Sequence, residues 1–93
     1  MKYVIKYSNS FKKDLKLLIK RGYDIIPLLN IINRIANDEV LESIYDDHPL
    51  KGNLKEYRCC HITSDWLLFY KKNKKDLILI MSRTGTHSDL YNM

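Results

Sequence analysis

The sequence predicts an α+β fold, a single domain in which an N-terminal helical hairpin packs on a mainly antiparallel sheet. Three observations support this class. Residues 2–7 alternate in polarity like a half-buried strand, residues 11–36 repeat apolar side chains at helical spacing, and three strand-like segments follow a loop that contains Pro and Gly. The resulting order is β-α-α-β-β-β, and 93 residues suffice for one domain, residues 1–93, with one modest core.

The first helix is expected directly after the first strand. Ser8, Asn9 and Ser10 are N-cap candidates, because their short side chains accept hydrogen bonds from unpaired backbone amides. Apolar side chains then recur at helical spacing from Phe11, while lysines fall mostly on the other side, and Gly22 is a typical C-terminal stop.

The second helix is expected to start near Asp24, with Pro27 in its first turn, where proline is tolerated. Its predicted buried stripe consists of Ile25, Leu28, Leu29, Ile32, Ile35 and Ala36.

The second half of the chain predicts three strands. Pro49 and Gly52 mark a loop, and strand candidates follow at residues 56–62, 66–71 and 76–83. Residues 63–65 and 72–75 would form the two connecting turns. The remaining segment, residues 84–93, is short and polar, so we expect no further core element there.

The composition indicates a folded cytoplasmic protein without a membrane segment. Hydrophobic residues make up 45% and charged residues 29% of the chain, which excludes a mainly disordered protein. No apolar run approaches the roughly 20 residues that span a bilayer.

Cys59 and Cys60 are adjacent, so a disulfide between them would be strained, and we expect free thiols that serve in packing.

The net charge of +5 is unevenly distributed. Basic side chains predominate in residues 1–37 and 48–83, and the acidic segment 38–47 lies between these blocks. Such blocks suit a surface that binds a polyanion such as a nucleic acid, although a solvated surface of a lysine-rich protein would show the same pattern.

All three histidines lie in loops or near strand ends of the second half, where scaffolds usually carry functional groups. Cleavage of RNA without a metal requires a base for the ribose 2′-hydroxyl, an acid for the leaving 5′-oxygen, and groups that stabilise charge on the phosphate. Histidine suits the first two roles and arginine the third. The sequence therefore contains the parts of a ribonuclease site, without showing their arrangement.

Three blocks of the second half resemble the YafQ-type toxins of the RelE/ParE toxin–antitoxin superfamily. They are DHPLKG at residues 47–52, YR..HI..DW.L.Y at residues 57–70 and RTGTH at residues 83–87. The segment YSNSFKKDLK at residues 7–16 is similar to the first strand and helix of that family, so the resemblance covers nearly the whole chain.

The resemblance implies a toxin that cleaves messenger RNA in the A site of the 70S ribosome, with lysine AAA codons as expected targets. It also implies a DinJ-like antitoxin that neutralises the toxin, and operator DNA as a partner only through the toxin–antitoxin complex. No cofactor and no metal ion are expected.

The resemblance also assigns catalytic residues. His48, His61, Asp65 and His87 match the catalytic histidines and aspartate, and Arg83 matches the arginine at the scissile phosphate. We expect His87 to be the general acid, Asp65 or His48 the general base, and His61 a residue that orients substrate or tunes a neighbour. An aspartate can serve as the base only if its surroundings raise its pKa.

Five further residues are candidates for substrate binding. Trp66 matches a family tryptophan, although a core aromatic is an equally good interpretation, and Tyr91 stands where relatives often have phenylalanine. Lys51, Lys55 and Arg58 are candidates for phosphate contacts, or else solvated surface charges.

Three other functions are compatible with parts of the pattern. A ParE-like toxin that poisons DNA gyrase would not need the histidines and the aspartate. A non-catalytic RNA- or ribosome-binding module would keep the basic surface and tolerate loss of His87. A metal site built from Cys60, His61, His48 and His87 would lack the paired cysteine spacing of common zinc sites.

Overall fold

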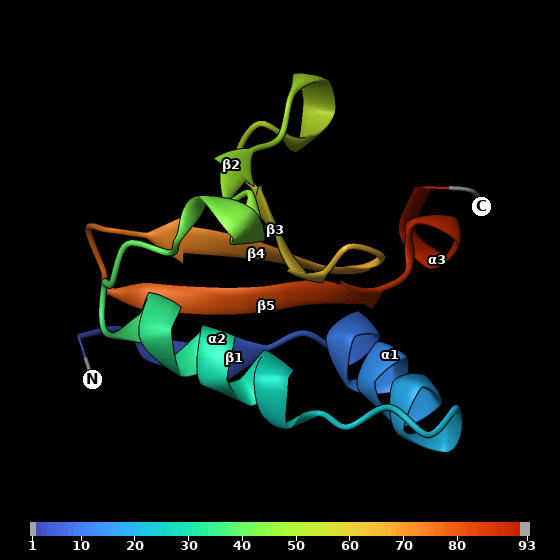
Figure 1. The fold of residues 1–93 in the computed structure, drawn as a ribbon. Helices are drawn as coiled ribbons and strands as arrows, with labels where there is room; N and C mark the ends of the chain where they lie inside the picture. The colour runs from blue at the N-terminus through green and yellow to red at the C-terminus, as the bar shows by residue number, and fades with distance from the viewer. Residues whose placement is uncertain (1, 92–93) are drawn as a thin grey trace.

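A sheet with the strand order β1-β5-β4-β3-β2 organises the protein, and the helices α1 and α2 cover one of its faces (Figure 1). The computed structural model describes residues 2–91. The strands are β1 (Val4–Tyr7), β2 (His48–Pro49), β3 (Arg58–Thr63), β4 (Trp66–Asn73) and β5 (Ile78–Gly85). The helices are α1 (Asn9–Lys20), α2 (Ile26–Ala36) and α3 (His87–Tyr91), with single 3₁₀ turns η1 (Ser43–Tyr45) and η2 (Gly52–Leu54).

The predicted fold class is confirmed. The pairs β2–β3, β3–β4 and β4–β5 are antiparallel, and only β1 pairs in parallel, with β5. Ser8 is the N-cap of α1, and its hydroxyl accepts a hydrogen bond from the amide of Phe11 at 3.0 Å. Within residues 2–91, no helix is long and apolar enough to cross a membrane.

The main core lies between the sheet and the two helices. From α2 it takes Leu28, Ile31, Ile32, Ile35 and Ala36, so most of the predicted stripe is buried. From the sheet it takes Cys60, Leu68, Tyr70, Leu79 and Met81.

Both cysteines are buried free thiols, as predicted. Burial raises the pKa of Cys59 to about 11, so this thiol stays protonated at neutral pH.

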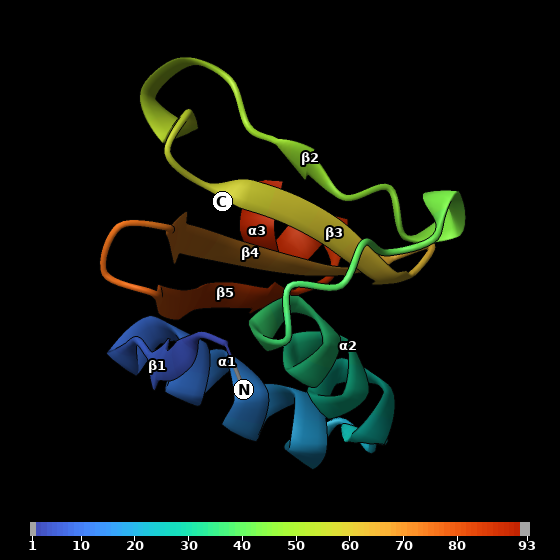
Figure 2. The ribbon, with the colours of Figure 1, turned by 90° about the vertical axis from the view of Figure 1, so that its left-hand side faces the viewer.

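The opposite face of the sheet, called the open face below, carries a second and smaller apolar cluster. Cys59, Leu67, Phe69 and Leu90 form it, and Leu50 packs against it. Leu90 belongs to α3, so the expectation that residues 84–93 add nothing to the core is wrong. Leu90 packs α3 on the face of the sheet opposite α2 (Figure 2), and so polar a segment gives little periodicity by which to predict a helix.

The sheet departs from regular pairing at the end of β5. Phe69 pairs with Arg83 whereas Tyr70 pairs with Met81, which leaves Ser82 as a bulge. Without the bulge, strand alternation would place Arg83 on the same face as Met81, under the helices. The bulge instead places Arg83 in one row with His48, Cys59 and Phe69, across four strands.

Candidate active site

The end of the open face brings Asp65 and His87 into contact. Asp65 lies in the turn between β3 and β4, and His87 opens α3. One carboxylate oxygen, Oδ1, accepts hydrogen bonds from the backbone amide of His87 at 3.0 Å and from its ring Nδ1 at 2.6 Å. A carboxylate only accepts, so Nδ1 carries a proton and Nε2 is the nitrogen left for a substrate.

These bonds favour the ionised form of Asp65. The backbone amide of His87, and then its ring, lower the pKa of the Asp65 carboxyl. A general base works best with a pKa near neutral pH, so the lowered pKa of Asp65 favours His48 over Asp65 for that role. Asp65 instead orients the His87 ring.

A capping box fixes the first turn of α3. The amide of Asp89 donates to the Thr86 hydroxyl at 3.1 Å, and the amide of Thr86 donates to the Asp89 carboxylate at 2.9 Å. Arg21, at the end of α1, grips the same carboxylate with two hydrogen bonds of 2.8 and 3.2 Å. Gly85 makes room for this arrangement, because a Cβ there would lie 2.9 Å from the Asp89 side chain. His87 is therefore held from both its preceding and its following residues.

His48 and His61 both lie close to another acidic residue, Asp46. Nδ1 of His48 lies 2.6 Å from the backbone carbonyl oxygen of Asp46, which can only accept, so Nδ1 carries a proton and Nε2 is the ring nitrogen left for a substrate. The Asp46 carboxylate lies 3.5 Å from Nδ1 of His48 and 3.6 Å from Nδ1 of His61. Within the part of the chain that the structure describes, Nδ1 of His61 is buried without a hydrogen-bond partner.

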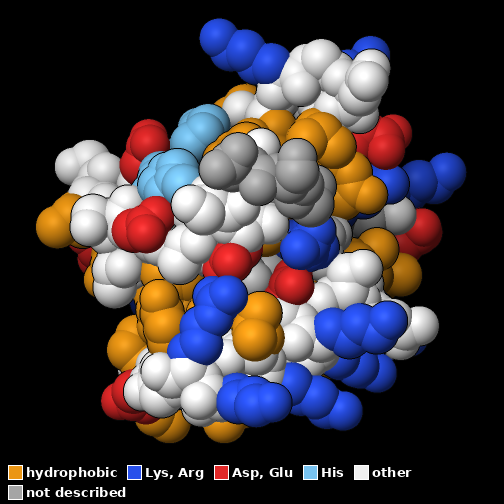
Figure 3. Space-filling model, turned by 90° about the vertical axis from the view of Figure 1, so that its right-hand side faces the viewer, with side chains coloured by type: hydrophobic (Ala, Val, Ile, Leu, Met, Phe, Trp, Pro, Cys, Tyr) orange, Lys and Arg blue, Asp and Glu red, His pale blue; other side chains and the backbone are white. Residues whose placement is uncertain are grey.

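Aromatic rings connect this group across the open face. Ring centroids lie 5.6 Å apart between His61 and His87, 6.1 Å between His87 and Tyr91, and 5.5 Å between Tyr91 and Phe69. Figure 3 shows histidine side chains grouped on one side of the molecule, with acidic side chains close by and Lys and Arg side chains gathered below them. Tyr91 thus lies next to His87, and its contact with substrate stays a prediction.

Arg83 lies on the same face and is held by α1. Its Nε and Nη2 donate to the two carboxylate oxygens of Asp14 at 2.6 and 3.2 Å, and these bonds raise the pKa of the guanidinium. Asp14 also accepts the amide of Thr84 at 3.1 Å. β1 ends at Tyr7, which pairs with Met81, so β1 does not extend along the last residues of β5. There the Asp14 carboxylate accepts a backbone amide of β5 that a neighbouring strand would otherwise bind.

The two lysines predicted to bind substrate lie near this face. Lys51 and Lys55 are exposed and flank η2. That turn also supplies Leu54 to a groove of about 320 Å³ that Arg83 lines.

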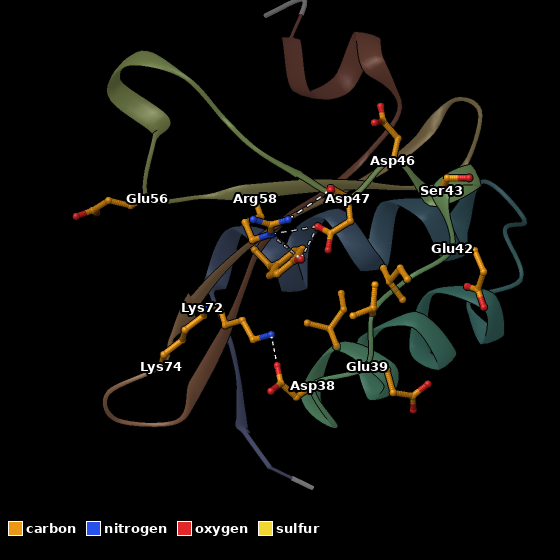
Figure 4. A pocket seen from close by; sticks show the side chains of 14 residues that line it. Asp38, Glu39, Glu42, Ser43, Asp46, Asp47, Glu56, Arg58, Lys72 and Lys74 are labelled. Carbon is orange, nitrogen blue, oxygen red and sulfur yellow. Dashed lines mark hydrogen bonds and ion pairs between the residues drawn. The ribbon is translucent and has the colours of Figure 1, made fainter.

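Two other predicted binding residues lie elsewhere. Trp66 is a core residue, 4% exposed, with its indole N–H donating to the Thr84 hydroxyl at 3.0 Å, so direct contact with substrate is excluded in this structure. Arg58 lies at a separate hollow of about 600 Å³ near the end of α2, where Asp47 and Tyr70 bind its Nε at 3.3 and 3.2 Å (Figure 4).

The structure also bears on a metal site. Cys60 packs in the core under the helices, whereas its neighbour His61 contacts the ring of His87, so the four residues of the alternative metal site do not converge. Among residues 2–91, no group of three or more His, Cys, Asp or Glu side chains is placed to hold a metal ion.

Sequence reasoning missed the acidic residues that position the site, Asp14, Asp46 and Asp89. The capping box Thr-x-x-Asp at residues 86–89 was readable in the sequence. The contact of Asp46 with His48 spans only two residues, whereas the contacts of Asp14 with Arg83 and of Asp46 with His61 depend on the tertiary fold.

The chain matches a known family of bacterial toxins over nearly its whole length. Residues 3–92 match the family described as bacterial toxin of type II toxin-antitoxin system, YafQ. The protein is therefore a toxin of the type II class. It belongs to the YafQ family.

Individual relatives agree over almost the full chain. The mRNA interferase toxin YafQ of Escherichia coli K12 is 41% identical over 88 residues, which are 94% of each chain. A metal-bound toxin from Helicobacter pylori superposes with a TM-score of 0.89 at 42% identity, covering 96% of this chain and 99% of that one. The toxin in the E. coli DinJ-YafQ toxin-antitoxin complex superposes with a TM-score of 0.87 at 39% identity, covering 98% and 99%.

Proposed function

We propose that this toxin is an mRNA interferase, an endoribonuclease that cleaves messenger RNA in the ribosomal A site by metal-independent acid–base catalysis. The observation that carries the proposal is the Asp65–His87 pair, which fixes a proton on Nδ1 of His87 and leaves Nε2 for the substrate. The E. coli relative, named an mRNA interferase, supports the choice of substrate.

The reaction needs a base, an acid and a phosphate ligand. Nε2 of His48 removes the proton from the ribose 2′-hydroxyl, whose oxygen attacks the adjacent phosphorus. Nε2 of protonated His87 donates its proton to the leaving 5′-oxygen as the P–O5′ bond breaks, which yields a cyclic phosphate and a 5′-hydroxyl. Arg83 stabilises the charge on the phosphate, and His61 orients the substrate or tunes its neighbours.

The partners follow from the same proposal. The E. coli structure of a DinJ-YafQ complex supports a DinJ-like antitoxin, and operator DNA is bound through that complex. Four exposed lysines on α1 support an acidic antitoxin segment there: Lys12, Lys13, Lys16 and Lys20. Its affinity should fall as salt rises, and an affinity independent of salt would contradict this electrostatic model. The toxin acts in the cytoplasm, and lysine AAA codons are its expected targets.

The proposal is tested by translating a defined message in vitro and mapping cleavage by primer extension. We expect the wild type to cut at particular codons only when ribosomes are present, and His87→Ala to lose about a hundredfold or more in rate. Asp65→Ala should lose at least tenfold, because the ring loses its orientation, while Asp76→Ala, in the β4–β5 turn, serves as the matched control. Absence of cleavage by the wild type would refute the nuclease and direct attention to DNA gyrase.

Metal independence has its own test, made necessary by the metal-bound relative from H. pylori. A chelator selective for transition metals is required, because ribosomes need magnesium. Cleavage should be unchanged after the toxin is treated with it. A loss of activity that a single added metal restores would contradict acid–base catalysis by side chains alone.

A further inference from the structure

The groove beside Arg83 has the form of a binding site for one aromatic ring. Its volume is about 320 Å³, at the lower end of the range for small-molecule sites. Leu54, Tyr57 and Phe69 give it apolar and aromatic walls, and Arg83 is the charged residue among those that line it. Three serines, Ser8, Ser10 and Ser82, complete the lining.

Contacts between and beside the lining residues hold the walls of the groove in place. The Ser8 hydroxyl accepts the amide of Phe11 and donates to the carbonyl of Ser82 at 2.8 Å, which ties α1 to β5. Nζ of Lys71 lies over the Tyr57 ring, 5.9 Å from its centroid. A preformed groove loses less entropy on binding than one that must be assembled.

The groove adjoins the proposed reaction centre at two points. Arg83, the proposed phosphate ligand, lines the groove. Its Nε and Nη2 donate to Asp14, while its Nη1 has no hydrogen-bond partner within residues 2–91. Phe69 also lines it, and its ring contacts Tyr91, which stacks on His87. If Arg83 binds a phosphate, the nucleoside attached to that phosphate would therefore lie at the entrance of this groove.

We infer that the groove binds one nucleobase of the RNA strand, next to the phosphate that Arg83 holds; this inference rests on the proposed ribonuclease function. An aromatic wall beside a cation is the combination by which proteins hold unpaired bases, through stacking and charge. The stacking energy increases with the area of the ring, so the groove favours a purine over a pyrimidine. Tyr57 and Phe69 are substrate-positioning residues in this arrangement.

Nucleotide binding can be measured apart from cleavage. The protein is titrated with adenosine monophosphate, uridine monophosphate or ribose 5-phosphate while its aromatic resonances are followed by NMR. We expect adenosine monophosphate to shift the Tyr57 and Phe69 ring signals saturably, uridine monophosphate to bind more weakly, and ribose 5-phosphate to leave the ring signals unchanged. Adenosine monophosphate that shifts His87 and Arg83 but neither ring would overturn the inference, as would equal effects of the nucleotides and the sugar phosphate.

Variants test the residue assignment. Tyr57→Ala should weaken adenosine monophosphate binding on the order of tenfold, whereas Tyr57→Phe keeps the ring and should bind like the wild type. Tyr7→Ala is the matched control, because that partly exposed tyrosine packs against Phe11 and does not line the groove. Unchanged binding by a folded Tyr57→Ala would refute the assignment, and Leu54→Ala provides a second truncation of the same groove.

The cleavage assay separates this inference from the proposed function. In the translation system, Tyr57→Ala should raise KM while kcat changes little, because Tyr57 contacts a base and not the reacting atoms. If the wild type cleaves and Tyr57→Ala matches it in KM, the subsite is wrong and the nuclease stands. If no cleavage occurs and nucleotides still shift the rings, the nuclease is wrong and the subsite stands.

Discussion

Gly85→Ala should damage catalysis without touching a reacting group. The added Cβ would lie 2.9 Å from both Cβ and Oδ2 of Asp89, whereas ordinary contacts begin at 3.4 Å. Residue 85 and Asp89 must therefore move apart by about half an ångström. The carboxylate cannot yield alone, because Oδ2 accepts bonds from Thr86 at 2.9 Å and from Arg21 at 2.8 Å. The first turn of α3, which carries His87, must therefore move.

The size of the effect follows from these contacts. Overpacking of this kind costs about 1–3 kcal/mol of folding stability. A displacement of 1 Å at a catalytic group can cost about a hundredfold in rate, so a shift of half that size should reduce the cleavage rate about tenfold. The measurements are single-turnover cleavage on programmed ribosomes and thermal unfolding of the same variant.

Gly52→Ala is the control for this substitution. Gly52 also has a positive φ, of 66°, but nothing lies within 4 Å of an added Cβ. It should cost about 1 kcal/mol through backbone strain and leave the rate unchanged. A Gly85→Ala protein that cleaves within twofold of the wild type would show that the capping box does not position His87.

Three further variants probe other parts of the site. Asp14→Asn should raise KM severalfold with a smaller change in kcat, because Arg83 loses its charged anchor; an unchanged KM would show that the arginine positions itself. Trp66→Phe should lower the free energy of unfolding by about 1–3 kcal/mol, because the buried Thr84 hydroxyl loses a donor, while the rate of the folded fraction stays the same. Hydrogen bonds hold the pKa of Asp89 at about 2 instead of 3.8, so it stabilises the fold above about pH 4 and this contribution is lost as pH falls toward 2. The difference in unfolding free energy between wild type and Asp89→Asn should therefore shrink over that interval; a constant difference would contradict it.

The regular elements were predictable because their signals are local. Polarity alternates in residues 2–7 with a period of two, and apolar residues recur along α1 and α2 with the helical period. Gly52 likewise marked a turn before the long antiparallel strands, whereas Pro49, which was expected in a loop, lies in β2. β2, with two residues, is too short to produce any period, and it was missed.

The sequence pointed to residues that the fold brings together, such as His61, Asp65 and His87, but it did not show how they contact one another. The motifs indicated His87 and Asp65 together, but the lowered pKa of Asp65 arises from a hydrogen bond with a residue 22 positions away. The face on which Arg83 lies depends on the bulge at Ser82, which strand alternation does not reveal. Trp66 was equally compatible with core and surface, and only packing decides between them.

The parallel pairing of β1 with β5 has a consequence for how the toxin comes into being. Ser8 bonds to Ser82, and Asp14 binds Arg83, so the earliest and latest segments of the chain complete each other. Contacts so distant in sequence form slowly and only after both partners have been synthesised. A nascent chain that lacks β5 has no strand to join β1 to β4 and also lacks Arg83 and His87, so a protein truncated at Lys75 should be unfolded and harmless. The ribosome that makes this toxin would thus release it before the toxin can act.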